Sequence, residues 1–145
     1  MDIKKDLVRE YLWKLLLVVG TQWQTTRHSE RTLGLILGTI GEHLSIPFRS
    51  PNSTHVFHQY TLKTSAEYRD KLIKYLTEKE IPAMIYYPVP LYRQEAFSSY
   101  VPDNFSYDNI EKLCNSVFSL PIHSEKENSQ QEKIIEAVRS FFNSI

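Results

Sequence analysis

Residues 55–82 read HVFHQYTLKTSAEYRDKLIKYLTEKEIP, and this stretch decides the fold class of the chain. In its first part, residues 55–63, side chains alternate between two faces with the period of a β-strand. The face that carries most apolar groups is made of Val56, His58, Tyr60 and Leu62. Thr64 and Glu67 then have the spacing of a capping box, and Pro82 follows the end of the helix that this box begins. The stretch therefore predicts a strand that runs directly into a helix.

The predicted helix has one apolar side, which needs a sheet or another helix to cover it. That side is made of Tyr68, Leu72, Tyr75 and Leu76. After it, residues 83–87 predict a second short strand that Pro88 stops, because proline has no N–H to donate to a sheet. The chain thus returns to the sheet after the first helix.

Two more helices and a third strand complete the pattern. Ser106 is placed to cap a helix whose end merges into a strand over 117–122, broken at Pro121. The apolar side of this helix is made of Ile110, Leu113, Cys114 and Val117. Ser129 and Glu132 have the spacing of a second capping box, at the start of the last helix. The stripe of that helix is made of Ile134, Ile135, Val138, Phe141 and Phe142.

Strands and helices in the order β-α-β-α-β-α predict an α/β fold of the two-layer α+β kind. We expect a small antiparallel or mixed three-stranded sheet with helices on one face. All 4 glycines precede residue 44 and all 7 prolines follow it, so the chain is divided into residues 1–43, a helical segment, and residues 44–145.

The composition excludes some classes of function. Lys plus Arg and Asp plus Glu both number 17, so no net field favours nucleic acid or an anionic membrane. The chain has 1 cysteine, Cys114, which rules out an internal disulfide and fits a cytoplasmic location. The acidic residues near the start are unlike a signal peptide, and no stretch is long enough to cross a bilayer.

The usual catalytic patterns are not found. His55 and His58 are three positions apart on a predicted strand, so they point to opposite faces and cannot share a metal ion. Cys114 lies on the apolar side of a helix, where an inert buried thiol is the usual case. The glycines match no phosphate-binding loop. We therefore predict no catalytic residue and no metal site.

The segment 86–97, YYPVPLYRQEAF, is unusual because two prolines stiffen a path that carries three tyrosines. Such a loop can project polar groups toward a ligand. The composition alone favours the alternative, a proline-rich connection whose tyrosines pack on the sheet.

The same segment carries a resemblance to a known family. Residues 86–94, YYPVPLYRQ, resemble the hYPxPLhxQ signature of the DegT/DnrJ/StrS sugar aminotransferases. Residues 56–60, 69–81 and 111–122 resemble three other family segments in the same order, and the resemblance covers residues 44–145. Two positions depart from the pattern: Tyr92 stands where many relatives have His, and Glu80 stands where glycine is usual.

The resemblance implies the small C-terminal domain of an enzyme that uses pyridoxal phosphate and moves an amino group, usually from glutamate, to a nucleotide-linked keto sugar. It implies a separate large domain that carries the cofactor lysine, and a homodimer of the intact enzyme. No lysine here is placed to hold the cofactor covalently, so we expect this chain to be inactive alone. The substrate-binding residues that it implies are Tyr87, Tyr92 and Gln94, with His58 and Tyr60 as weaker candidates.

Without the large domain, we expect Val56, Tyr60 and Tyr86 to be uncovered. A second interpretation stays open, in which the chain is a stand-alone α/β binding or interaction module, or the remnant of a degraded gene.

Overall fold

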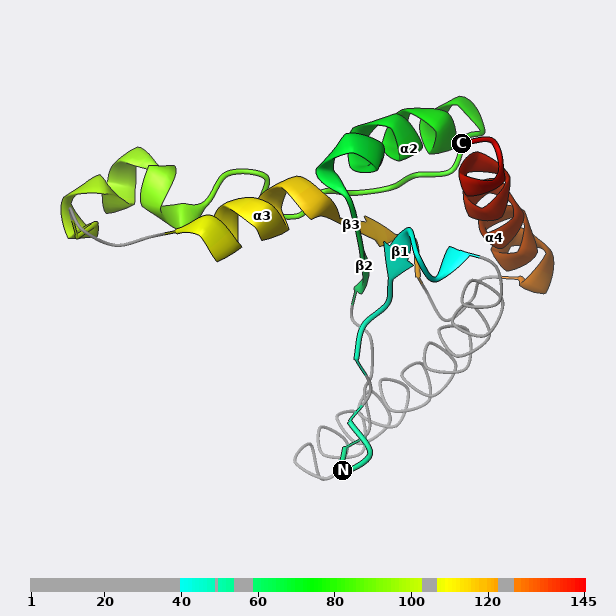
Figure 1. Ribbon diagram of the computed structural model, residues 1–145, viewed down its shortest axis with the longest axis horizontal. Helices are drawn as coiled ribbons and strands as arrows, with labels where there is room; N and C mark the ends of the chain where they lie inside the picture. The colour runs from blue at the N-terminus through cyan, green and yellow to red at the C-terminus, as the bar shows by residue number, and fades with distance from the viewer. Residues whose placement is uncertain (1–39, 49, 54–58, 103–106, 123–126) are drawn as a thin grey trace, which may run out of the picture.

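A computed structural model describes residues 40–48, 50–53, 59–102, 107–122 and 127–145 (Figure 1). The strands are β1 (Leu44–Ser45), β2 (Tyr60–Thr64) and β3 (Val117–Leu120). The α-helices are α2 (Ala66–Glu78), α3 (Asp108–Ser116) and α4 (Asn128–Asn143). Two 3₁₀ helices, η1 (Leu91–Arg93) and η2 (Glu95–Tyr100), lie between α2 and α3. None of the described helices is both long and apolar enough to cross a membrane.

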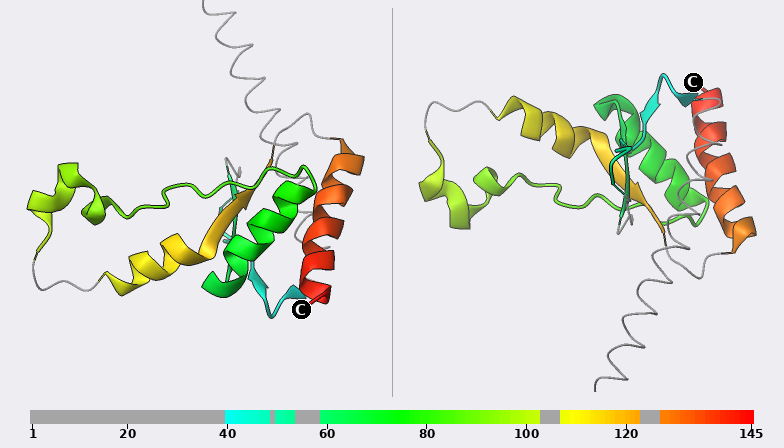
Figure 2. Two further views of the ribbon diagram at one scale, coloured as in Figure 1. Left: turned by 90° about the horizontal axis from the view of Figure 1, so that it is seen from above. Right: turned by 90° about the horizontal axis from the view of Figure 1, so that it is seen from below.

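The three strands form one antiparallel sheet in the order β1-β2-β3, which confirms the predicted fold class. Leu44 is opposite Thr64, and Leu62 is opposite Phe118. Both α2 and α4 cover the same face of this sheet, as the two turned views in Figure 2 show. The alternation in β2 explains the arrangement, because Tyr60 and Leu62 turn to that face and are buried.

The predicted order of strands and helices is wrong at its second strand. Residues 83–87 form no strand, and only Met84 makes an isolated bridge, to Ser119 of β3. The third strand is instead β1, two residues long, which carried no recognisable signal. The described order is therefore β1, β2, α2, α3, β3, α4. The predicted strand over 55–63 is found as β2, while Val56 and His58 lie outside the described residues.

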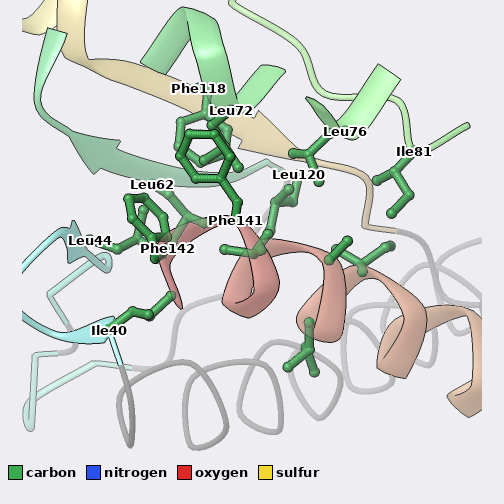
Figure 3. Close-up of a cluster of buried hydrophobic side chains, with 14 of the residues drawn as sticks. Ile40, Leu44, Leu62, Leu72, Leu76, Ile81, Phe118, Leu120, Phe141 and Phe142 are labelled. Atoms are coloured by element: carbon green, nitrogen blue, oxygen red, sulfur yellow. The ribbon is translucent and has the colours of Figure 1, made fainter. Parts of the chain in front are cut away.

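One hydrophobic core joins the sheet to α2 and α4 (Figure 3). Leu62, Leu72 and Phe118 are fully buried in it. The predicted stripe of the last helix is confirmed, since the following residues are all buried: Ile134, Ile135, Val138, Phe141 and Phe142. The predicted side of α2 is buried at Leu72 and Leu76 and half-buried at Tyr68 and Tyr75. We call the sheet with α2 and α4 the body.

Both predicted capping boxes are wrong. The N-cap of α2 is Ser65 and that of α4 is Glu127, and neither makes a side-chain capping hydrogen bond. Thr64 is still part of β2, and its hydroxyl donates to the carbonyl of His43 at 2.8 Å. Because the buried Thr64 side chain is directed at His43, it does not cap the next helix.

The end of α2 has the geometry of a Schellman motif. The Ile81 N–H donates to the Leu76 carbonyl at 2.9 Å, and the Glu80 N–H donates to the Thr77 carbonyl at 3.0 Å. Glu80 occupies the left-handed position with φ 59°, where glycine is the usual residue. The departure at Glu80 therefore keeps the usual helix exit, at the cost of a side chain in a strained backbone region.

Residues 84–102 and α3 form an arm that extends away from the body (Figures 1 and 2). The prediction that α3 buries its apolar side is wrong. Ile110 and Leu113 are exposed, and Val117 belongs to β3. The expected exposure of Tyr86 is confirmed, whereas the expected exposure of Tyr60 is wrong. Ser106 lies outside the described residues, and Tyr107 is the N-cap of α3.

A buried arginine connects the arm to the body. Arg69 on α2 donates from Nη1 to the carbonyl of Cys114 at 2.9 Å, and its Nε is 2.6 Å from the Asp70 carboxylate. Cys114 is in the last turn of α3, where carbonyls have no partner within the helix. Arg69 therefore satisfies the end of α3 and fixes where the arm leaves the body.

Candidate functional site

The segment that carried the family signature, residues 86–94, is the motif loop of the arm. It leaves the sheet after Met84 and turns at Tyr87, which has φ 59° and an exposed fraction of 79%. A bulky residue in the left-handed region is uncommon and costs about 1–3 kcal/mol of strain, which surrounding contacts must offset. Residues held in such a backbone region cluster at active sites, ligand clamps and switch regions.

One stripe of α3 supports the motif loop. Tyr107, Glu111 and Cys114 are spaced so that they share one side of the helix. Tyr107 and Glu111 contact Tyr92, while the Cys114 thiol lies 3.6 Å from the carbonyl of Tyr87 in donor geometry. The loop therefore rests on a helix that follows it in the sequence and not on the sheet.

The contacts at Tyr92 combine stacking with a charged acceptor. Its ring stacks on that of Tyr107, with centroids 4.0 Å apart and an interplanar angle of 17°. Its hydroxyl donates to the Glu111 carboxylate, and Arg93 Nη2 reaches the same carboxylate oxygen at 2.7 Å. Hydrogen bonds to an ionised group are about twice as strong as neutral ones, so Glu111 holds two successive loop residues in place.

Gln94 closes the motif loop. Its Nε2 donates to the carbonyl of Val89 at 3.4 Å, and its backbone N–H donates to the Leu91 carbonyl at 3.0 Å. The Arg93 N–H donates to the Pro90 carbonyl, also at 3.0 Å. These bonds form η1 and place Tyr92 and Gln94 in one turn, while Tyr87 precedes that turn and its carbonyl lies against Cys114 of α3.

The two weaker candidates do not join this turn. Tyr60 lies in β2 at the centre of the body and is 2% exposed, so its ring packs in the hydrophobic core. His58 lies outside the described residues. A contact of either side chain with a ligand stays a prediction.

A shallow pocket lies where the motif loop leaves the sheet. Gln59 and Ser119 are its polar lining residues, and Met84 and Tyr86 contribute apolar surface. The Ser119 hydroxyl is already hydrogen-bonded to that of Thr61, 2.8 Å away. None of the described residues that line this pocket is charged, so they offer no charged partner for a phosphate or a carboxylate.

The described lysines are on the surface, as the sequence predicts for them. Lys71 pairs with Glu67 at 3.3 Å, and the ammonium of Lys79 is 4.9 Å from the centroid of the Tyr75 ring. The others that the structure describes, all exposed, are Lys63, Lys74, Lys112 and Lys133. None of these six sits in an enclosed site, as a lysine that holds a cofactor must. Among the described residues, no group of His, Cys, Asp or Glu could hold a metal ion.

Sequence reasoning missed Glu111 and Tyr107 as parts of the site. The sequence pattern that predicted this helix is formed by its apolar residues, such as Ile110 and Leu113, and the structure leaves both exposed. The positions 107, 111 and 114 have the same helical spacing as an apolar stripe, but they carry polar groups. This pattern could have identified the side of the helix that supports the motif loop.

The pattern of the DegT/DnrJ/EryC1/StrS aminotransferase family matches residues 20–139 of the chain. A pleiotropic regulatory protein of Geobacillus stearothermophilus is 32% identical over 119 residues, which are 82% of this chain and 32% of that protein. The dTDP-3-amino-3,4,6-trideoxy-alpha-D-glucose transaminase of Streptomyces venezuelae is 32% identical over 98 residues, which are 68% of this chain and 25% of that protein. The chain thus spans about a third or less of each of these relatives.

Solved structures agree with the sequence comparison. S. venezuelae DesV, solved with a ketimine intermediate, superposes with a TM-score of 0.79 at 27% identity, over 88% of this chain and 33% of DesV. A DegT DnrJ EryC1 StrS aminotransferase from Brucella abortus superposes with a TM-score of 0.78 at 27% identity, over 90% of this chain and 33% of that one. The match from residue 20 leaves the division at residue 44 a prediction. With most of its length matched and a loop, sheet and helices that superpose on solved members, the chain belongs to the DegT/DnrJ/EryC1/StrS aminotransferase family.

Proposed function

We propose that this chain forms the small C-terminal domain of a pyridoxal-phosphate-dependent aminotransferase that acts on a nucleotide-linked keto sugar. The family supports the reaction class, and relatives whose names specify dTDP-linked and UDP-linked amino sugars support the substrate class. Glutamate as amino donor, cytoplasmic location and a homodimer of the intact enzyme belong to the same proposal.

The observation that carries the proposal is the exposed apolar surface of the arm. Large apolar residues there are exposed by about 40–80%. They are Met84, Tyr86, Tyr87, Val89, Leu91, Phe97, Tyr100, Ile110 and Leu113. Large apolar side chains that are left exposed on one part of a protein are typical of a protein or ligand interface. Because the chain spans about a third of its relatives, we assign this surface to contact with the large domain of the enzyme.

The cofactor does not fit the residues described here. Pyridoxal phosphate needs a lysine amine inside a cleft and donors that surround its phosphate. The six described lysines are exposed, and none of the described residues that line the pocket beside Tyr86 is charged. We therefore assign cofactor binding to the large domain and derive no chemical step through the cofactor in this chain.

The role left to this chain is to shape the substrate cleft. The motif loop presents Tyr87 and holds Tyr92 and Gln94 in a fixed turn, and we assign it to the wall that faces the sugar. A rigid wall lowers the ordering cost of binding, because the backbone that carries its side chains is already in place before the ligand arrives.

A graft tests the proposed function. Residues 20–139 replace the matching segment of the S. venezuelae transaminase, and turnover of its dTDP-sugar is measured with the cofactor bound. We expect measurable transamination, and we expect Tyr87→Ala in the graft to raise KM for the sugar nucleotide about tenfold or more. Glu136→Gln, an exposed change on α4, is the matched control and should leave KM unchanged.

Two results would contradict the proposal. One is a folded graft that binds cofactor and has no turnover at any sugar concentration. The other is the isolated chain holding pyridoxal phosphate covalently, seen after borohydride reduction as a single stoichiometric lysine adduct by mass spectrometry. Tight binding of a sugar nucleotide by the isolated chain, with no effect in the graft, would instead favour the stand-alone binding module.

A further inference from the structure

We propose that Tyr92 and Glu111 form an anchor that positions the motif loop, and that Tyr87 is the tyrosine which this loop presents to the ligand. Tyr92 is then a positioning residue that acts through the loop, and Glu111 is its partner. The identity of the ligand rests on the proposed function. The anchor itself is a property of the chain as it stands.

Every polar contact described for Tyr92 is directed at its own chain. Its hydroxyl donates to the Glu111 carboxylate, its ring stacks on Tyr107 at 4.0 Å, and the side chain is half-buried. The Arg93 guanidinium lies 5.9 Å from the centroid of the same ring. A ligand that used the Tyr92 hydroxyl would have to replace a charge-assisted hydrogen bond, which is costly to break.

Glu111 is the point where the anchor is attached to α3. One of its carboxylate oxygens accepts from Tyr92 and is 2.7 Å from Arg93 Nη2. The Glu111 side chain is 28% exposed and that of Arg93 is 61% exposed, so the carboxylate is the more shielded partner. A shielded carboxylate shared by two successive residues fixes the direction of η1, which a single surface ion pair would not do.

Tyr87 has the opposite character. It is 79% exposed, and its side chain makes no hydrogen bond or ring contact within the described part of the chain. Its backbone is held in the left-handed region at φ 59°, and its carbonyl is near the thiol of Cys114. The stripe of α3 thus holds the Tyr87 backbone and the Tyr92 side chain, which leaves the Tyr87 side chain free to bind.

Hydrogen exchange on the 145-residue chain tests the anchor without any need for activity. The Arg93 and Gln94 amides are bonded within the loop at 3.0 Å and report its opening. We expect Tyr92→Phe and Glu111→Gln each to speed their exchange about three- to tenfold. Because the two side chains act through one contact, the double variant should exceed the larger single effect by less than about twofold.

Controls in the same experiment separate the anchor from general unfolding. Lys112→Gln changes an exposed residue next to Glu111 and should leave the two amides unchanged. Amides of α2 and α4 should keep their protection in every variant. If Glu111→Gln lowers that protection as well, Arg93→Gln removes the ion pair alone and should still speed exchange about two- to threefold. Unchanged exchange in these variants, or fully additive effects, would overturn the anchor.

Kinetics of the grafted enzyme test which tyrosine meets the ligand. Tyr92→Phe and Glu111→Gln should raise KM for the sugar nucleotide by the same factor, with kcat changed less than about twofold and no further rise in the double variant. Tyr87→Phe should raise KM independently of both. A rise with Tyr92→Phe and none with Glu111→Gln would show direct contact at Tyr92 and overturn this assignment. An inactive graft would count against the proposed function, while the exchange result would still decide the anchor.

Discussion

In the body, Leu62, Leu72 and Phe118 are fully buried, whereas in the arm Leu91, Tyr100 and Leu113 leave between 49% and 80% of their surface exposed. The body is stabilised by its own core. The arm is held by a few polar contacts, chiefly those of Arg69 and Glu111. The difference indicates that the body buries its own apolar surface, whereas the apolar surface of the arm needs another protein surface to cover it.

The largest expected effect is on the free energy of unfolding, when a side chain is truncated in the core of the body and in the arm. Phe118→Ala should lower the free energy of unfolding by about 3–5 kcal/mol, because it leaves a cavity at a fully buried position. Leu113→Ala in the arm should change it by less than about 0.5 kcal/mol, since half of this side chain is already in water. Urea denaturation followed by circular dichroism measures both. Similar losses in the two variants would show that the arm belongs to the cooperative core.

A smaller effect is expected at the junction of the two regions. Arg69→Met should lower the free energy of unfolding by about 1–3 kcal/mol, because the half-buried carbonyl of Cys114 loses its donor while the apolar stem is kept. Hydrogen exchange should rise in α3 more than in α4, since the end of α3 loses its partner. Arg139→Met on α4 is the matched control, and equal exchange in α3 and α4 after Arg69→Met would refute a junction role.

The smallest expected effects on the free energy of unfolding are at two residues, one in each region, that share the left-handed backbone conformation. Glu80 in the body and Tyr87 in the arm each have φ 59°. Glu80→Gly should raise the free energy of unfolding by about 0.5–1 kcal/mol, because glycine removes the strain at the end of α2. Tyr87→Gly should leave it unchanged within error, since the arm opens without unfolding the body. A thermal shift of equal size in both would mean that the regions unfold together.

Periodicity predicted the parts of the fold that depend on burial. The alternation at Tyr60 and Leu62 gave β2, and the stripe from Ile134 to Phe142 gave α4, because each pattern reflects one covered face. The same logic failed at Ile110 and Leu113, where an apolar stripe faces outward. The periodicity of apolar residues indicates that one face of an element is covered. It does not indicate whether the covering surface belongs to the same chain.

The candidate site was located by a motif and not by spacing. The resemblance indicated Tyr87, Tyr92 and Gln94. The structure holds Tyr92 and Gln94 at η1 and the Tyr87 carbonyl beside Cys114, and their contact with a ligand stays a prediction. The partners in α3 were missed because Tyr92 and Glu111 are 19 positions apart, and local sequence does not reveal contacts of that range. Short elements failed for a related reason: β1 has only two residues and carries no period.

The bridge between Met84 and Ser119 also protects the sheet. Ser119 exchanges both backbone hydrogen bonds with Met84, at 2.7 and 3.0 Å, so the outer side of β3 is occupied at that residue. An open strand edge is a template for pairing with another chain, and a bridge at its middle interrupts that template. Proteolytic removal of the arm would therefore do more than delete a binding loop: it would uncover a sheet edge from which fibrils could grow.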